Sequence, residues 1–166
     1  MVARATASER AWEAQARSSF PTYFWNMKKA RDSAADGSTP TTPSLTLLYG
    51  LDAAVSMIET ETIERVWERH SLVGERCRAG IAGLGLRLLP CESIASNTVT
   101  AFYPPEGLSA RQIVDRLKRE HSITVAGGQG HMADAIVRIG HMGWVDEEDI
   151  EICINALGQT IQSPSA

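Results

Sequence analysis

The chain has 166 residues, of which 43% are hydrophobic and 22% are charged, and these values are typical of one globular domain. Its formal net charge of -4 and the lack of a basic cluster argue against a general nucleic-acid-binding surface. No apolar run approaches membrane-spanning length, and the first residues do not form a signal-peptide core. We therefore expect a cytoplasmic protein whose partner is a small molecule or another protein chain.

The cysteines give little sign of a disulfide framework or a metal site. They are odd in number and widely spaced, and no two form a Cys-x-x-Cys pair: Cys77, Cys91 and Cys153. This pattern predicts reduced and mostly buried thiols, and no metal site is expected.

The front of the chain begins with a short helix and an aromatic-rich segment. Ser8 is placed to cap a helix that ends near Arg17. Residues 20–27 then carry four large rings in a chain that is only 6% aromatic. Such a segment is either a satellite core cluster or part of a subunit interface, where aromatic side chains are enriched.

Residues 32–44 are rich in Ser, Thr, Pro and Asp and predict a loop. A plain linker is the simplest interpretation. The end of this segment, Thr41-Thr42-Pro43, leads into a helix with Pro43 suited to the first helical position. Hydroxyls and free amides at a helix start also suit an anion, although this signal is unspecific.

Two helices follow, over residues 44–58 and from Ile63 to about Leu84, because apolar residues recur there at steps of three and four. Gly85 is placed to end the second helix. His70 lies on the apolar stripe of that helix, so we expect a core histidine with satisfied hydrogen bonds rather than a ligand.

The back half alternates between strands and helices. Strands are predicted over residues 86–89 and 97–102, and Ser109 with Gln112 forms a capping box for a helix. Two strands then surround the glycine-rich segment 127–130. Asp146 begins a last helix that Gly158 is expected to end, followed by a disordered tail over residues 159–166. This order predicts an α+β unit with a small antiparallel or mixed sheet and helices on one face.

Arg138 is the anomaly in the second of these two strands. A permanent cation inside an apolar strand is costly unless an anion meets it. On residue type alone, an internal salt bridge is favoured over a bound carboxylate or phosphate. The neighbouring Gly-Gly-Gln-Gly fits neither the dinucleotide fingerprint nor the P-loop, and it is more typical of a turn that needs positive φ.

Six segments in this order resemble the C-terminal portion of class V pyridoxal-phosphate aminotransferases, the alanine–glyoxylate and serine–pyruvate group. The branch that resembles it most is often labelled as the small subunit of a cyanobacterial soluble hydrogenase. The segments cover nearly the whole chain and together make a specific match: residues 8–12, 42–51, 66–70, 96–100, 126–130 and 137–143.

The resemblance implies part of a fold-type I α/β subunit that works as a dimer. Residues 1–43 would be a remnant of the large cofactor domain and its loop, residues 44–84 the connecting helices, and residues 85–158 the small C-terminal α+β domain. Members of this group transfer an amino group from a small amino acid, such as alanine or serine, to a 2-oxo acid such as glyoxylate or pyruvate.

The resemblance also implies roles for individual residues. Arg138 would bind the substrate carboxylate, which overturns the salt-bridge interpretation. Thr42, or Thr41 if the loop length differs, would reach the phosphate of pyridoxal 5'-phosphate across a dimer interface. The family's Schiff-base lysine, its cofactor-stacking residue and its pyridine-binding aspartate lie upstream of the matching region. None of the chain's three lysines has the family's context, so we expect the chain alone to be inactive: Lys28, Lys29 and Lys118.

Three interpretations follow. The chain is a piece of an aminotransferase, as a truncated product, a sequence with a misplaced start or one half of a split enzyme. Alternatively, it is a non-catalytic small-molecule-binding or regulatory module that kept the arginine. A hydrogenase-associated role has little support, because the chain has no cysteine-based cluster ligands.

Overall fold

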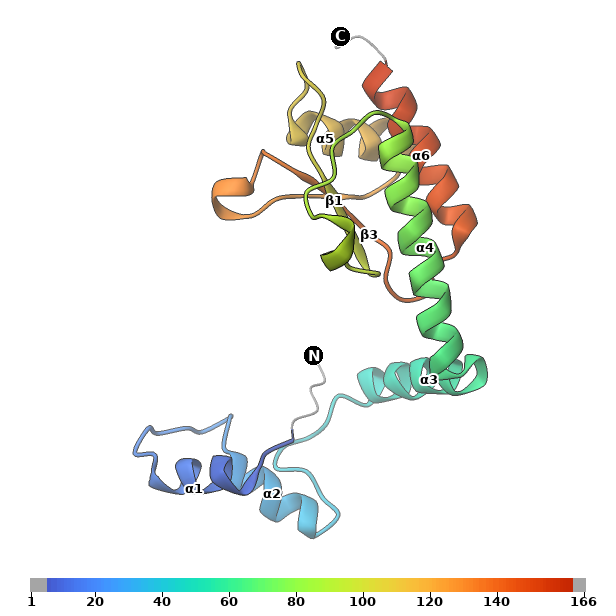
Figure 1. Cartoon of the computed structure of the whole chain (residues 1–166). Helices are drawn as coiled ribbons and strands as arrows, with labels where there is room; N and C mark the ends of the chain where they lie inside the picture. Colours follow the sequence, from blue (N-terminus) through green and yellow to red (C-terminus); the bar gives the residue numbers. More distant parts are fainter. Residues whose placement is uncertain (1–5, 163–166) are drawn as a thin grey trace. The chain divides into compact units, whose positions relative to one another are not determined.

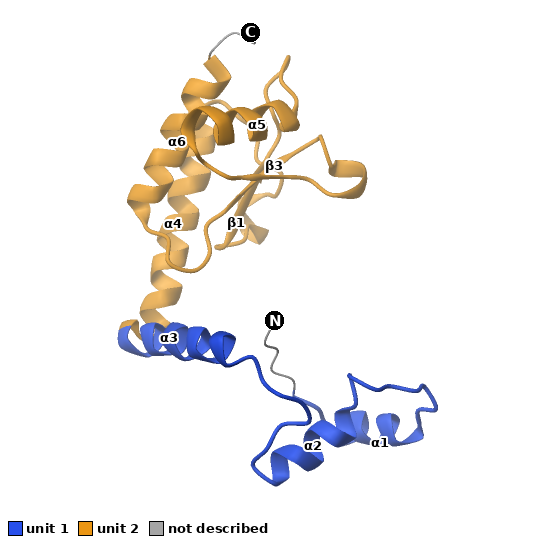
Figure 2. Ribbon diagram, turned by 180° about the vertical axis from the view of Figure 1, so that it is seen from behind, with its two compact units in different colours: residues 1–60 blue, residues 61–166 orange. Residues whose placement is uncertain are grey.

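The computed structural model describes residues 6–162. The chain divides into two compact units, residues 1–60 (unit 1) and residues 61–166 (unit 2), which Figure 2 shows in different colours. Each unit is described by itself. None of the helices within the described range is long and apolar enough to cross a membrane.

Unit 1 consists of helices joined by loops. It holds α1 (Glu9–Arg17), α2 (Met27–Ala35) and most of α3 (Leu45–Glu61). The Ser8 hydroxyl accepts a hydrogen bond from the Ala11 N–H, which confirms the predicted cap of α1. The exposed helix expected around Lys28 and Lys29 is α2, and its N-cap is Asn26.

Two details of the predicted loop 32–44 are wrong. The helix α2 extends to Ala35, so the loop begins later than its composition indicated. Pro43 precedes α3 instead of occupying its first position, because the carbonyl of Ser44 already accepts the first helical hydrogen bond, from the Leu48 N–H. A proline is tolerated equally well just before a helix.

Unit 2 begins with the long helix α4 (Ile63–Gly83). Gly85 has a φ of +74°, the Gly85 N–H donates to the Ala82 carbonyl, and the Leu86 N–H donates to the Ile81 carbonyl. This is the Schellman arrangement that glycine favours at a helix end. The predicted stop at Gly85 is therefore confirmed.

The three-stranded antiparallel sheet has the order β1 (Val99–Phe102), β3 (Val137–Gly140), β2 (Ala126–Gly127). Helix α5 (Ala110–His121) contacts β2 and β3, while α4 contacts β1 and packs against α6 (Glu147–Gln162). Figure 1 shows these helices beside the sheet. The expected small antiparallel sheet with helices on one face is confirmed. The predicted capping box of α5, Ser109 with Gln112, is also present.

The strand predicted over residues 86–89 is reduced to a single bridge between Leu88 and Phe102. The backbone here makes two edge hydrogen bonds, from the Leu89 N–H to the Ala101 carbonyl and from the Tyr103 N–H to the Arg87 carbonyl. Pro90 follows and lacks an N–H, so the ladder cannot continue. A short helical turn, η1 (Glu92–Ile94), then leads to β1.

Helix α6 continues past the predicted stop at Gly158 to Gln162. Residues 159–162 of the expected disordered tail are therefore helical, and residues 163–166 lie outside the described range. A Cβ on Gly158 would lie 3.2 Å from a methyl of Leu84, and the buried hydroxyl of Thr160 donates to the Ala156 carbonyl. Gly158 thus serves close packing against the end of α4 and does not end the helix.

The core of unit 2 lies between the sheet and the three helices α4, α5 and α6. Apolar side chains of all three helices meet the inward-facing residues of β1 and β3 there. The fully buried members include Cys77, Ile81, Phe102, Ile113, Leu117, Val137 and Leu157.

Candidate functional site

Arg138 lies in the central strand β3 and faces away from the core. Its neighbours Val137 and Ile139 are buried against the helices, whereas Arg138 is only partly buried. The strand register places Ala101 of β1 and Ala126 of β2 opposite Arg138 on its two sides. Because both neighbours carry only a methyl group, the guanidinium has little side-chain cover on this face of the sheet.

The Nε–H of Arg138 donates a hydrogen bond of 2.7 Å to the carbonyl of Gly127. Among the described residues, the two terminal nitrogens of Arg138 form no hydrogen bond and no carboxylate lies within ion-pair distance. The internal salt bridge favoured on residue type alone is thus absent from this part of the chain. The guanidinium keeps the paired donors with which arginine binds carboxylates.

The glycine loop, which we define as residues 128–136, joins β2 to β3 and returns closely over its own start. A Cβ on Gly128 would lie 1.9 Å from the Met132 carbonyl oxygen, and one on Gly127 would lie 2.9 Å from the Ala133 carbonyl oxygen. Only Gly130, with a φ of +55°, matches the expectation of a positive-φ turn. The first two glycines are instead required because the backbone passes so close to itself.

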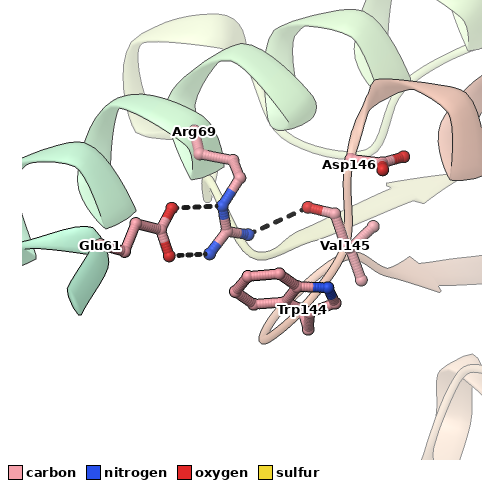
Figure 3. A pocket seen from close by; sticks show the side chains of 5 residues that line it. All are labelled: Glu61, Arg69, Trp144, Val145 and Asp146. Carbon is pink, nitrogen blue, oxygen red and sulfur yellow. Dashed lines mark hydrogen bonds and ion pairs between the residues drawn. The ribbon is translucent and has the colours of Figure 1, made fainter. Parts of the chain in front are cut away.

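A second set of polar contacts fixes the segment that follows β3 (Figure 3). The Arg69 guanidinium forms a two-point pair with Glu61, at 2.6 and 2.8 Å, and donates to the carbonyls of Gly143 and Val145. Its hydrogen bonds hold the pKa of the Glu61 carboxyl below its usual range and raise the pKa of Arg69. Arg69 also lies 5.5 Å from the ring centre of Trp144. These contacts join the start of α4 to the turn between β3 and α6.

His70 contributes to the same clamp. Its Nδ1 lies 2.7 Å from the Val66 carbonyl, and its Nε2 accepts from the Gly143 N–H at 3.2 Å. This assignment makes Nδ1 the protonated nitrogen. His70 is partly buried with both ring nitrogens engaged, so the expectation of a satisfied histidine is confirmed.

Sequence reasoning missed the pair of Arg69 with Glu61, because their separation of eight residues exceeds one helical turn. The break between α3 and α4 at Thr62, where φ is +73°, brings the two together. A positive φ at a threonine is uncommon and leaves no sequence signal of this kind.

A buried polar group that the sequence did not reveal lies next to β3. His141 is fully buried, its Nε2 lies 2.9 Å from the Thr100 hydroxyl, and its N–H donates to the Thr98 carbonyl. Its Nδ1 has no hydrogen-bond partner. Burial lowers the pKa of His141, although backbone contacts oppose this effect. The imidazole is therefore held neutral.

The thiols agree with the sequence prediction. All three are free, with Cys77 and Cys153 buried and Cys91 exposed. Burial raises the pKa of the Cys77 thiol, and it raises that of Cys153 to about 11. Both buried cysteines therefore stay protonated and behave as small apolar side chains.

The remaining predicted site residues are exposed. Thr41 and Thr42 precede α3 in unit 1, where the Thr39 hydroxyl donates to the Thr41 carbonyl. Arg138 belongs to unit 2, so the threonines and the arginine are each described within their own unit. Of the lysines, Lys28 pairs with Asp32 at 2.5 Å, and Lys118 lies exposed on α5.

The comparisons with known proteins agree with this geometry. The soluble hydrogenase small subunit of Synechococcus sp. (strain PCC 6716) is 36% identical over 150 residues, which cover 90% of this chain and 39% of that protein. An uncharacterized aminotransferase of Methanocaldococcus jannaschii is 35% identical over 153 residues, with the same coverage of 90% and 39%. The crystal structure of alanine–glyoxylate aminotransferase from Nostoc sp. superposes with a TM-score of 0.87 at 28% identity, covering 95% of this chain and 43% of that one.

The chain is homologous to the C-terminal part of class V aminotransferases. No family model matches it. The aminotransferase homologue spans about two fifths of the length of the curated relatives it matches. Its solved neighbours share the fold of fold-type I aminotransferases, again over part of their length.

The residues of this aminotransferase homologue do not form a complete pyridoxal-phosphate site by themselves. Such a site needs a lysine amine that can bond to the cofactor. Lys28 is engaged by Asp32 in unit 1, and Lys118 points the positive end of α5 towards no hydrogen bond among the described residues. Arg138 fits the carboxylate end of a substrate, but the covalent anchor of the cofactor has no candidate beside it.

Proposed function

We propose that the chain supplies the substrate-carboxylate side of an aminotransferase site, and that Arg138 binds the carboxylate of a small amino acid or 2-oxo acid. Alanine, serine, glyoxylate and pyruvate are the substrates in question, since alanine–glyoxylate and serine–glyoxylate aminotransferases are among its relatives. The observation that carries the proposal is the partly buried guanidinium of Arg138, which is anchored by one carbonyl and pairs with no described carboxylate.

The chemistry of a guanidinium suits this role. The Gly127 carbonyl takes the Nε–H, and the remaining donors of the planar fork stay free for a carboxylate. Ala101 and Ala126 flank the fork without covering it. A carboxylate bound there would exchange a partly hydrated cation for a charge-assisted pair, so the site would bind the acid and not its neutral amide.

The proposal assigns the covalent chemistry to another polypeptide. When bound, pyridoxal phosphate would supply the electron sink for transamination, and its lysine would come from a complementing chain in a homodimer-like or split assembly. Thr42, or Thr41, would contribute a hydroxyl to its phosphate. The chain by itself would bind the cofactor poorly and would not transaminate.

The exposed apolar side chains of α3 support the need for such a partner. None of the 17 residues of α3 is buried, although the helix carries large apolar side chains along its length. An apolar patch of this kind marks a surface that another protein covers.

A titration of the full-length chain tests the role of Arg138. With arginine side chains labelled for NMR, the Nε–H signal of Arg138 should shift on addition of pyruvate or glyoxylate and stay in place with the neutral pyruvamide. Binding should be weak, roughly 10 mM or above, since hydrogen bonds to one charged group contribute only about 1.5–3 kcal/mol.

Two variants complete this test. Arg138→Gln should abolish the response of the chain to pyruvate, whereas Arg119→Gln, which changes an exposed arginine of α5, should leave it unchanged. A response to pyruvate that survives in Arg138→Gln, or one that pyruvamide reproduces, would contradict the carboxylate role.

A further inference from the structure

The position of Gly127, and with it the anchor of Arg138, depends on the returning half of the glycine loop. Three backbone bonds fold this loop on itself: Met132 N–H to the Gln129 carbonyl, Ala133 N–H to the Gly130 carbonyl, and Ala135 N–H to the Met132 carbonyl, at 3.0, 3.2 and 3.0 Å. The return brings the Ala133 carbonyl within 2.9 Å of where a Cβ on Gly127 would lie. A shift of the returning half would therefore also release Gly127.

A carboxylate ties this half of the loop to helix α5. The Oδ1 of Asp134 accepts the backbone N–H of Arg111 at 2.9 Å, across a separation of 23 residues. Within the described part of the chain, this is the side-chain hydrogen bond that connects the loop to a helix. A hollow lies between helix and loop at this point, lined by Arg111, Val114, Gly127, Ala133 and Asp134. The bond spans a place where packing alone does not hold the loop.

The first turn of α5 is suited to this contact. Its Gln112 N–H is already taken by the Ser109 hydroxyl, so the free N–H of Arg111 is left for Asp134. A carboxylate at a helix N-terminus also gains from the helix dipole. The Arg111 side chain is 85% exposed and lies nearest to Asp115, so it does not draw Asp134 away.

We propose that Asp134 is a positioning residue for Arg138. By holding the returning half of the loop against α5, Asp134 fixes the Gly127 carbonyl, and that carbonyl fixes the Nε–H of the guanidinium. The inference rests on the proposed function, because an oriented fork matters most if Arg138 receives a substrate carboxylate.

The test measures the mobility of Arg138 directly, without any activity. In the full-length chain, the hydrogen-exchange rate of the Arg138 Nε–H is followed by NMR, with the His141 N–H, which bonds to the Thr98 carbonyl, as an internal reference. Asp134→Ala should speed exchange at Arg138 about tenfold and leave His141 unchanged, a tenfold change being about 1.4 kcal/mol. Asp134→Asn keeps an acceptor oxygen and should restore most of the protection.

A second variant perturbs the same link from the other side. Gly128→Ala places a Cβ at 1.9 Å from the Met132 carbonyl oxygen and should push the returning half away, so Arg138 should loosen although Asp134 is intact. Unchanged exchange at Arg138 in Asp134→Ala would overturn the inference. An equal rise at His141 would overturn it too, because the effect would then be a general loss of stability.

The pyruvate titration separates this inference from the proposed function. If Asp134→Ala loosens Arg138 while pyruvate never shifts its signal, the positioning role stands and the carboxylate role fails. If pyruvate shifts the signal in the parent chain, Asp134→Ala should weaken that response several-fold, and an undiminished response would show that the orientation set by Asp134 has no part in binding.

Discussion

The two units of this chain differ in how they treat their apolar side chains. In unit 2, helices α4, α5 and α6 and the sheet enclose a shared core that includes Phe102 and Leu157, both fully buried. In unit 1, neither α1 nor α2 has a buried residue, and none of α3 is buried either. Unit 2 therefore carries the information for its own fold, whereas unit 1 presents apolar surface for which the described residues supply no cover.

The difference also separates the two halves of the proposed site. Arg138 lies in the self-contained unit, on a strand whose register and neighbours are well defined. Thr41 and Thr42 lie in the exposed unit, just before α3. We expect the arginine to be oriented in the chain alone and the threonines to acquire their role only with a complementing chain.

The largest expected effect comes from a matched pair of leucines. Leu157→Ala removes a fully buried side chain of α6 and should cost about 2–5 kcal/mol of unfolding free energy. Leu51→Ala removes one that is 48% exposed on α3 and should change it by no more than about 0.5 kcal/mol. Urea denaturation followed by circular dichroism measures both. Equal costs would mean that α3 is covered after all, for example by self-association.

The clamp at the start of unit 2 should have an intermediate effect. Arg69→Ala removes hydrogen bonds to Glu61 and to two backbone carbonyls, and we expect a loss of about 1–2 kcal/mol, since the site is partly exposed. Arg65→Ala, one turn earlier and exposed, is the control and should stay within about 0.5 kcal/mol. Thermal unfolding of both variants checks this, and indistinguishable curves would show that the clamp does not stabilise unit 2.

Acid should destabilise unit 2 through His141. Burial lowers its pKa in the folded chain below the ordinary 6.5, so the unfolded chain binds the proton first and stability falls as the pH drops below about 6.5. His141→Gln should flatten this slope between about pH 7 and pH 5.5, while His131→Gln, an exposed position, should leave it unchanged. Stability that is independent of pH in the parent chain would refute this role. Glu61, whose pKa is lowered by Arg69, contributes at lower pH, where its stabilisation is lost.

The thiols give the smallest perturbation and a simple readout of the core. Cys91 is exposed, whereas Cys77 and Cys153 are buried with raised pKa values. A thiol reagent at neutral pH should label one cysteine quickly and the other two only as unit 2 opens. Rapid labelling of all three in native buffer would mean that the core is not closed.

Local signals in the sequence predicted much of this fold. The Ser109 and Gln112 capping box and the stop at Gly85 each depend on a few adjacent residues, and both are present. Gly158 misled the prediction because the same residue type serves helix ends and close packing, and only the position of Leu84 distinguishes the two. The strand at 86–89 failed because pairing with β1 ends before Pro90.

The site shows the same division. Arg138 was recognisable because a cation in an apolar strand is rare, and its match to the family strengthened the assignment. The contact of Asp134 with α5 and that of His141 with Thr100 span 23 and 41 residues. Contacts at such separations depend on the tertiary fold, and a single sequence carries no periodic or spacing signal for them.

Hydrogen exchange of the full-length chain, followed by mass spectrometry of its peptides, tests the contrast between the units most directly. The account predicts strong protection in the second half of α4, in β1 and β3 and in α6, and fast exchange throughout α1, α2 and the first turns of α3. Protection of α3 equal to that of α4 in the monomeric chain would contradict it, because unit 1 would then be folded and covered without a complementing chain.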